Sequence, residues 1–178
     1  MDKIDELFKM MVELDNSNST QLLALIGFIN GLLNDPTVDP GSQAFLTSLR
    51  TNLWLDLWKV NKEYKILESA INQIQKSLEK QVLSPQDIHA IGRVFYIFLS
   101  IHNVSKDSNI LNGAIYWGKM FSSFADQDFP YYTDSLCELA DRLGDRYQLS
   151  RNEQDLNESI TFYEQAIAFT SEEDVIRP

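Results

Sequence analysis

Four segments of the chain share one pattern, a Leu followed four residues later by an Ile: Leu22-Leu-Ala-Leu-Ile26, Leu67-Glu-Ser-Ala-Ile71, Leu111-Asn-Gly-Ala-Ile115 and Leu156-Asn-Glu-Ser-Ile160. The four leucines lie 45, 44 and 45 residues apart, and the residue before the Ile is small in the last three segments. A Leu and an Ile one helical turn apart cover one face of a helix, and a small residue between them lets a second helix backbone approach closely. The pattern predicts helix pairs that repeat with a period of 44–45 residues.

The helix that precedes each of the last three segments keeps the same register. Nine residues before the leucines lie Trp58, His102 and Tyr147, and four residues earlier lie Trp54, Phe98 and Leu143. One helix pair cannot bury this much apolar surface alone, whereas stacked pairs bury it between neighbours. The sequence therefore predicts an all-α chain of about eight helices, arranged as an α-solenoid of antiparallel pairs.

Apolar residues recur at spacings of three and four along the whole chain, which predicts individual helices. The breaks between the helices carry capping and turn residues, among them Asn16-Ser-Asn-Ser, Asp39-Pro40 and Ser84-Pro85. The expected helices cover residues 2–15, 19–34, 42–61, 64–81, 86–103, 108–124, 131–149 and 154–170. We expect a degenerate N-terminal capping pair over 1–41, three repeats over 42–84, 85–129 and 130–170, and a linker tail over 171–178.

The composition argues against several classes of function. The net charge is −11, a sign that repels nucleic-acid phosphates, so no nucleic-acid partner is expected. Residues 125–178 hold 13 acidic and 4 basic residues, which favours a basic partner or a solvated surface. No apolar run is long enough for a membrane span, and the charged N-terminal stretch is no secretory signal, so we expect a cytoplasmic protein, with the nucleus as the alternative.

The third helix pair resembles a tetratricopeptide repeat. The resemblance rests on Ala140-Asp-Arg-Leu143-Gly144-Asp-Arg-Tyr147, followed by Ser159, Tyr163 and Ala166. The longer period is similar to the extended tetratricopeptide arrays found beside caspase-like CHAT domains. This resemblance covers residues 42–170 and implies a right-handed solenoid, with a tail that resembles the linker to a further repeat of a longer protein.

The family resemblance also implies where a partner would bind. The first helices of tetratricopeptide repeats line a concave groove that holds peptides, and the matching positions here become acidic in the third repeat, which suits a basic or extended peptide. The implied groove residues are Asn52, Asp56, Lys59, Arg93, Tyr96, Ser100, Asn103, Glu138, Asp141, Asp145 and Gln148.

No catalytic or metal-binding pattern is found in the sequence. The chain has none of the common nucleotide-binding, hydrolase or zinc motifs. A nucleophile–base pair could come only from its single cysteine, Cys137, with His89 or His102, but we expect Cys137 and His102 to be core residues. Trp54 and Trp58 lie one turn apart and are expected to be core rather than a ligand platform. We therefore expect no enzyme, no cofactor and no metal.

Two functions remain after these exclusions. The first is a scaffold or adaptor module that binds a peptide or protein partner in its groove. The alternative is a regulatory fragment of a larger signalling or CHAT-type protease protein, whose catalytic domain lies elsewhere.

Overall fold

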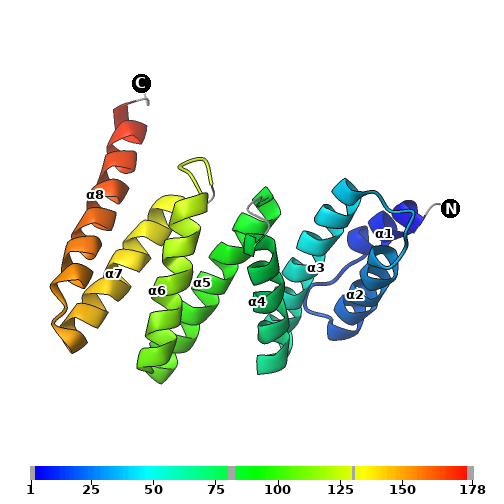
Figure 1. The fold of residues 1–178 in the computed structure, drawn as a ribbon, viewed down its shortest axis with the longest axis horizontal. Coiled ribbons are helices and arrows are strands. Elements are labelled where there is room, and N and C mark those ends of the chain that lie inside the picture. Colours follow the sequence, from blue (N-terminus) through cyan, green and yellow to red (C-terminus); the bar gives the residue numbers. More distant parts are fainter. Residues whose placement is uncertain (1–2, 80–82, 130, 176–178) are drawn as a thin grey trace. The chain divides into compact units, whose positions relative to one another are not determined.

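The computed structural model describes residues 3–79, 83–129 and 131–175, without the side chains of Ile4 and of residues 170–175. These residues form eight α-helices and no β-strand (Figure 1). The helices are α1 (Lys3–Val12), α2 (Ser19–Leu33), α3 (Pro40–Asn61), α4 (Tyr64–Glu79), α5 (Pro85–Ser105), α6 (Ser108–Phe124), α7 (Tyr132–Ser150) and α8 (Glu153–Val175). The predicted all-α class and the predicted number of helices are confirmed for this part of the chain.

Local capping chemistry explains most helix starts. Asn18 and Asp107 accept hydrogen bonds from the first free backbone N–H groups of α2 and α6, and Asp39 does so for α3, with Pro40 at the first helical position. At the start of α5, the Ser84 hydroxyl accepts from the Asp87 N–H while the Asp87 carboxylate accepts from the Ser84 N–H, a capping box. The polar breaks in the sequence are therefore helix boundaries.

The first helix of each of three pairs ends on a basic residue with left-handed backbone. The φ angles are 58° at Lys62, 55° at Lys106 and 58° at Arg151. The N–H of each donates to the carbonyl oxygen four residues before it, with N···O distances of 2.7, 2.8 and 2.7 Å. The three residues are 44 and 45 positions apart, so this helix ending recurs with the period of the Leu/Ile pattern.

The chain divides into two compact units, Met1–Ala90 and Ile91–Pro178. In the N-terminal unit α2 packs on α3, α3 packs on α4, and α1 packs on α2. The α2 residues Leu22, Ile26 and Ile29 are at most 3% exposed, which makes them the core of this unit.

The C-terminal unit is built around Phe95, which is fully buried, and around the packing of α6 on α7 and α7 on α8 (Figure 1). Two glycines of α6 lie against aromatic rings of α5. A Cβ atom on Gly113 would lie 2.3 Å from the ring of Phe98, and one on Gly118 would lie 2.9 Å from the ring of Phe95. Gly113 and Gly118 therefore permit a close approach of α5, whereas the sequence pattern assigned this role to the neighbouring Ala114.

Within each unit, next-but-one helices meet in the same register. Residues 39 positions apart are in contact at Ser48 and Asp87 in the N-terminal unit. The C-terminal unit has three such pairs, Tyr96 with Ser135, Asn103 with Arg142, and Lys119 with Glu158. With the same offset, side chains of α3 reach α5, side chains of α5 reach α7, and those of α6 reach α8. The solenoid arrangement of the whole chain stays a prediction.

The structure differs from the prediction at both ends of the third repeat. α8 runs to Val175, five residues past the predicted end at 170, so residues 171–175 of the predicted linker tail are helical. Residues 176–178 of that tail lie outside the described residues. At its start, α7 has Tyr131 in the capping position with left-handed backbone and no side-chain cap.

Candidate functional site

The eleven predicted groove residues fall into both units. Asn52, Asp56 and Lys59 lie on α3 in the N-terminal unit. The other eight lie in the C-terminal unit, with Arg93, Tyr96, Ser100 and Asn103 on α5 and Glu138, Asp141, Asp145 and Gln148 on α7. We call those eight residues the α5–α7 face.

Two direct contacts hold α5 and α7 together beneath this face. The hydroxyl oxygens of Tyr96 and Ser135 lie 3.0 Å apart, and burial raises the pKa of the Tyr96 hydroxyl. Two turns further on, Arg142 Nη1 donates to Asn103 Oδ1 at 3.3 Å. The predicted neighbours Tyr96, Asn103 and the α7 acids are therefore brought together.

Arg142 organises the acidic residues of α7. Its Nη1 lies 3.1 Å from Asp145 Oδ2, and its Nη2 lies 4.0 Å from Glu138 Oε2. The Arg142 side chain is only 16% exposed, and its Nε is buried with no hydrogen-bond partner among the described residues. Its charge offsets one of the two neighbouring carboxylates, both of which are 44% exposed, and Asp145 is the closer of the two.

Asp141 is fixed by a different partner, because its carboxylate accepts a hydrogen bond from the Tyr163 hydroxyl of α8. This hydrogen bond raises the pKa of Tyr163 to about 12, with a smaller contribution from burial. Asp141 and Asp145 thus each make a close contact inside the C-terminal unit, whereas Glu138 is held only by the longer approach to Arg142.

The α3 residues are less suited to binding. The Asn52 amide donates to the carbonyl oxygens of Ser48, at 3.1 Å, and Gln86, at 3.3 Å. Asn52 and Asp56 are half-buried, and only Lys59 is exposed. The Asn52 side chain therefore has a structural role in joining α3 to the start of α5.

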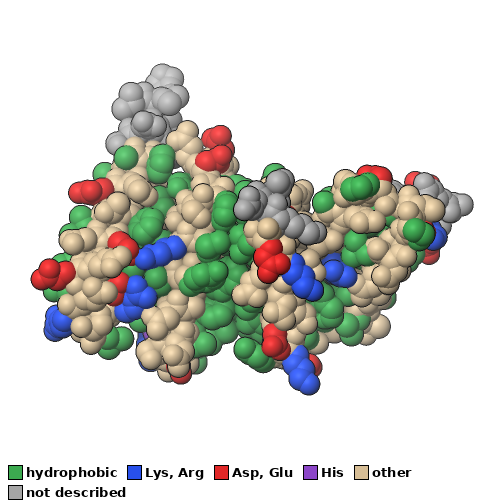
Figure 2. All heavy atoms as spheres, viewed as in Figure 1, with side chains coloured by type: hydrophobic (Ala, Val, Ile, Leu, Met, Phe, Trp, Pro, Cys, Tyr) green, Lys and Arg blue, Asp and Glu red, His purple; other side chains and the backbone are tan. Residues whose placement is uncertain are grey.

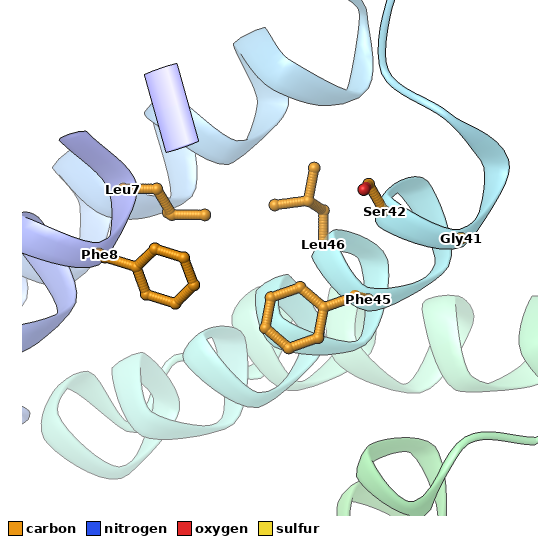
Figure 3. Close-up of a pocket in the computed structure, with 6 residues that line it drawn as sticks. All are labelled: Leu7, Phe8, Gly41, Ser42, Phe45 and Leu46. Carbon is orange, nitrogen blue, oxygen red and sulfur yellow. The ribbon is translucent and has the colours of Figure 1, made fainter. Parts of the chain in front are cut away.

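The N-terminal unit has an apolar pocket between α1 and the first turns of α3 (Figure 3). Its volume is about 350 Å³, and it is lined by Leu7, Phe8, Gly41, Ser42, Phe45 and Leu46. Figure 3 shows the rings of Phe8 and Phe45 on opposite sides of the opening. The hydroxyl of Ser42 donates to Asp39, so the pocket suits an apolar group and offers little to a charged one.

The possible nucleophile is poorly placed for chemistry. Cys137 is half-buried, and burial, together with the charges of Asp134, Asp141 and Glu138, raises the pKa of its thiol. A raised pKa disfavours the reactive thiolate. His102 is 5% exposed, and its Nδ1 lies 3.1 Å from the carbonyl oxygen of Asp107, so its predicted core position is confirmed. Trp58 is buried as predicted, whereas Trp54 is only half-buried.

Among the described residues, no group of three or more His, Cys, Asp or Glu side chains converges to hold a metal ion. None of the described helices combines the length and apolarity that a bilayer crossing requires. No family model, no curated protein and no solved structure matches the chain. The tetratricopeptide resemblance therefore stays a prediction.

Sequence reasoning missed the residues that fix the acidic side chains. Arg142 lies four residues after Glu138 and three before Asp145, a spacing that does predict contacts on one helix face. The pairing of Asp141 with Tyr163 and of Arg146 with Asp155 joins two helices, and no local pattern signals it.

Proposed function

We propose that the chain is a protein-interaction module and that its α5–α7 face binds a basic, extended segment of a partner protein. The observation that carries this proposal is the row of Glu138, Asp141 and Asp145 along α7, in which Asp141 and Asp145 each make a close contact inside the C-terminal unit. Charges that are already oriented lose little conformational entropy when a partner binds. The resemblance to tetratricopeptide repeats supports the same face. For the compartment we propose the cytoplasm or the nucleus, because a chain with one cysteine has no internal disulfide.

The chemistry of the face favours Lys and Arg over other partner residues. The face has three carboxylates on α7, and the neighbouring α5 adds one cation, Arg93, the amide of Asn103 and the hydroxyls of Tyr96 and Ser100. Hydroxyl and amide groups can accept from and donate to a peptide backbone, while the carboxylates select for positive side chains. Arg142 reduces the net charge of the face, so we expect modest affinity that depends on salt.

The test uses the full chain and a labelled, extended peptide with Lys at every second position. Glu138→Gln with Asp145→Asn removes two carboxylates and leaves Arg142 without its acidic partners, so binding measured by fluorescence anisotropy should weaken roughly three- to tenfold. Asp141 is left unchanged because it also holds Tyr163.

The matched control is Glu63→Gln with Glu68→Gln, which removes the same charge from exposed positions of the N-terminal unit. This control should bind the peptide within about twofold of the unmodified chain if the effect is local. Equal weakening in both double variants would mean that only net charge attracts the peptide, and the α5–α7 face would lose its role.

A further inference from the structure

The outer side of α8 exposes a row of large apolar residues. Leu156, Ile160, Tyr163 and Ile167 are 36, 47, 38 and 65% exposed. Their spacings of four, three and four place them on one face of the helix. We call these four residues the α8 stripe.

The matching residues of α2 and α6 are buried, and each of these helices packs on the helix that follows it. Leu22 and Ile26 on α2 are 0 and 3% exposed, where α3 packs on α2. Leu111 and Ile115 on α6 are 1 and 2% exposed, where α7 packs on α6. The α8 stripe therefore matches residues that are buried on α2 in one unit and on α6 in the other, but on α8 these residues are exposed.

The inner side of α8 is firmly attached, so the stripe cannot turn inward. Ser159 Oγ donates to the Ala140 carbonyl oxygen at 2.7 Å. Arg146 binds the carboxylate of Asp155 through two hydrogen bonds, of 2.9 and 2.6 Å. These contacts fix the rotation of α8 on α7 and leave the stripe facing outward.

Acidic residues border the stripe on two sides. Glu153 lies one turn before Leu156, and Glu164 lies one turn after Ile160, on the adjoining edge. On the side of α7, Asp141 contacts Tyr163. No Lys or Arg occurs anywhere in α8, and Figure 2 shows acidic and hydrophobic side chains together on the α8 side of the C-terminal unit.

We propose that the α8 stripe is a docking site for an amphipathic helix of a partner protein, with an apolar face flanked by Lys or Arg. An apolar row alone would accept many helices, and the acidic borders select a basic one. A second copy of this chain is a poor occupant, because its own α8 would bring Glu153 and Glu164 against the same acids. This site goes beyond the α5–α7 face, and either can fail without the other.

The experiment uses the full chain and a synthetic helical peptide with Leu at positions i, i+4, i+7 and i+11 and Lys on both flanks. Ile160→Ser with Ile167→Ser removes exposed apolar groups and should leave the fold intact, as circular dichroism can verify. We expect this variant to bind the peptide at least about tenfold more weakly than the unmodified chain. The same peptide with Glu in place of Lys should bind much more weakly to the unmodified chain.

The matched control is Val104→Ser with Leu149→Ser, which changes two exposed apolar residues of the same unit that lie outside the α8 stripe. The control should keep its affinity. Three results would overturn the proposal: no detectable binding of the basic peptide, equal losses in the two double variants, or a dimer of the unmodified chain, seen by analytical ultracentrifugation, that Ile160→Ser with Ile167→Ser abolishes. Loss of Lys-peptide binding in Glu138→Gln with Asp145→Asn concerns the α5–α7 face alone.

Discussion

At the scale of single residues, Asp155 shows how the third helix pair is held together. Asp155 is 2% exposed and belongs to the first turn of α8, where a negative charge is favourable. Arg146 of α7 binds both of its carboxylate oxygens and also donates to Asn112 Oδ1 at 3.1 Å. One guanidinium therefore connects α6, α7 and α8.

Replacing Arg146 by Ala should destabilise the fold by about 2–4 kcal/mol, because it leaves a buried carboxylate without its partner. Urea unfolding followed by circular dichroism measures this loss. Adding Asp155→Asn to Arg146→Ala should recover part of it, since the amide carries no charge. Lys65→Ala, at an exposed position, should change the stability by less than about 0.5 kcal/mol. A similar small change for Arg146→Ala would contradict the prediction.

Tyr163 should titrate unusually high. Its pKa is raised from 10.0 to about 12 by the hydrogen bond to Asp141. Because the folded pKa lies above the unfolded one, this contact stabilises the fold below pH 10, and the contribution is lost as the pH rises toward 12.

The measurement is an ultraviolet titration of tyrosinate compared between the unmodified chain and Asp141→Asn, with Tyr163→Phe to identify the signal. In Asp141→Asn the pKa of Tyr163 should fall toward 10. If the two titration curves coincide, the Asp141 contact does not control the Tyr163 hydroxyl.

At the scale of helices, the glycines of α2 and α6 should respond to substitution in opposite ways. A Cβ atom on Gly113 would lie too close to the Phe98 ring. Gly27 and Gly31 of α2 have nothing within 4 Å of the place a Cβ would take. Glycine thus permits close packing in α6, whereas in α2 it only lowers the helix propensity.

Gly113→Ala should destabilise the chain by about 1–3 kcal/mol, because the steric conflict exceeds the gain of about 1 kcal/mol in helix propensity. Gly27→Ala and Gly31→Ala should each stabilise it by up to about 1 kcal/mol. Thermal unfolding of the three variants tests the sign. A stabilising Gly113→Ala would mean that the Phe98 ring moves aside freely.

Also at this scale, the sequence predicts the helices better than it predicts their endings. Apolar spacing and capping residues locate all eight helices because each signal is local. The left-handed endings at Lys62, Lys106 and Arg151 were missed, since Lys and Arg do not signal a conformation that usually takes Gly. Two of these residues lie over rings four positions earlier, with Lys62 Nζ 4.4 Å from the Trp58 ring and Arg151 5.7 Å from the Tyr147 ring. This contact and the helix dipole both favour a cation there.

At the scale of the whole molecule, charge is distributed unevenly. Residues 1–90 carry 12 acidic and 8 basic residues, and residues 91–178 carry 14 and 7. The C-terminal unit therefore holds the larger net negative charge, and it also contains both proposed binding surfaces. These totals follow from the sequence, but the contact of Asp141 with Tyr163 joins two helices and does not.

Binding of the Lys-containing peptide should therefore weaken as salt is added. The screening length falls from about 30 Å at 0.01 M to about 10 Å at 0.1 M ionic strength, so attraction between exposed charges is reduced. Anisotropy titrations at the two salt concentrations provide the measurement, with the helical peptide for comparison. Binding of the helical peptide should be less sensitive to salt, because part of its affinity comes from apolar contacts. An extended peptide that binds equally at both concentrations would argue against recognition by the acids of α7.

The half-buried thiol of Cys137 makes α7 accessible to a direct kinetic experiment. With one cysteine in the chain, every alkylation event reports on one position in one helix. Partial burial and a raised pKa slow that reaction, and any further opening around Cys137 should speed it. If loosening α8 by Arg146→Ala speeds the reaction, then α7 and α8 open as one body, and a partner bound along α8 would slow the opening of both.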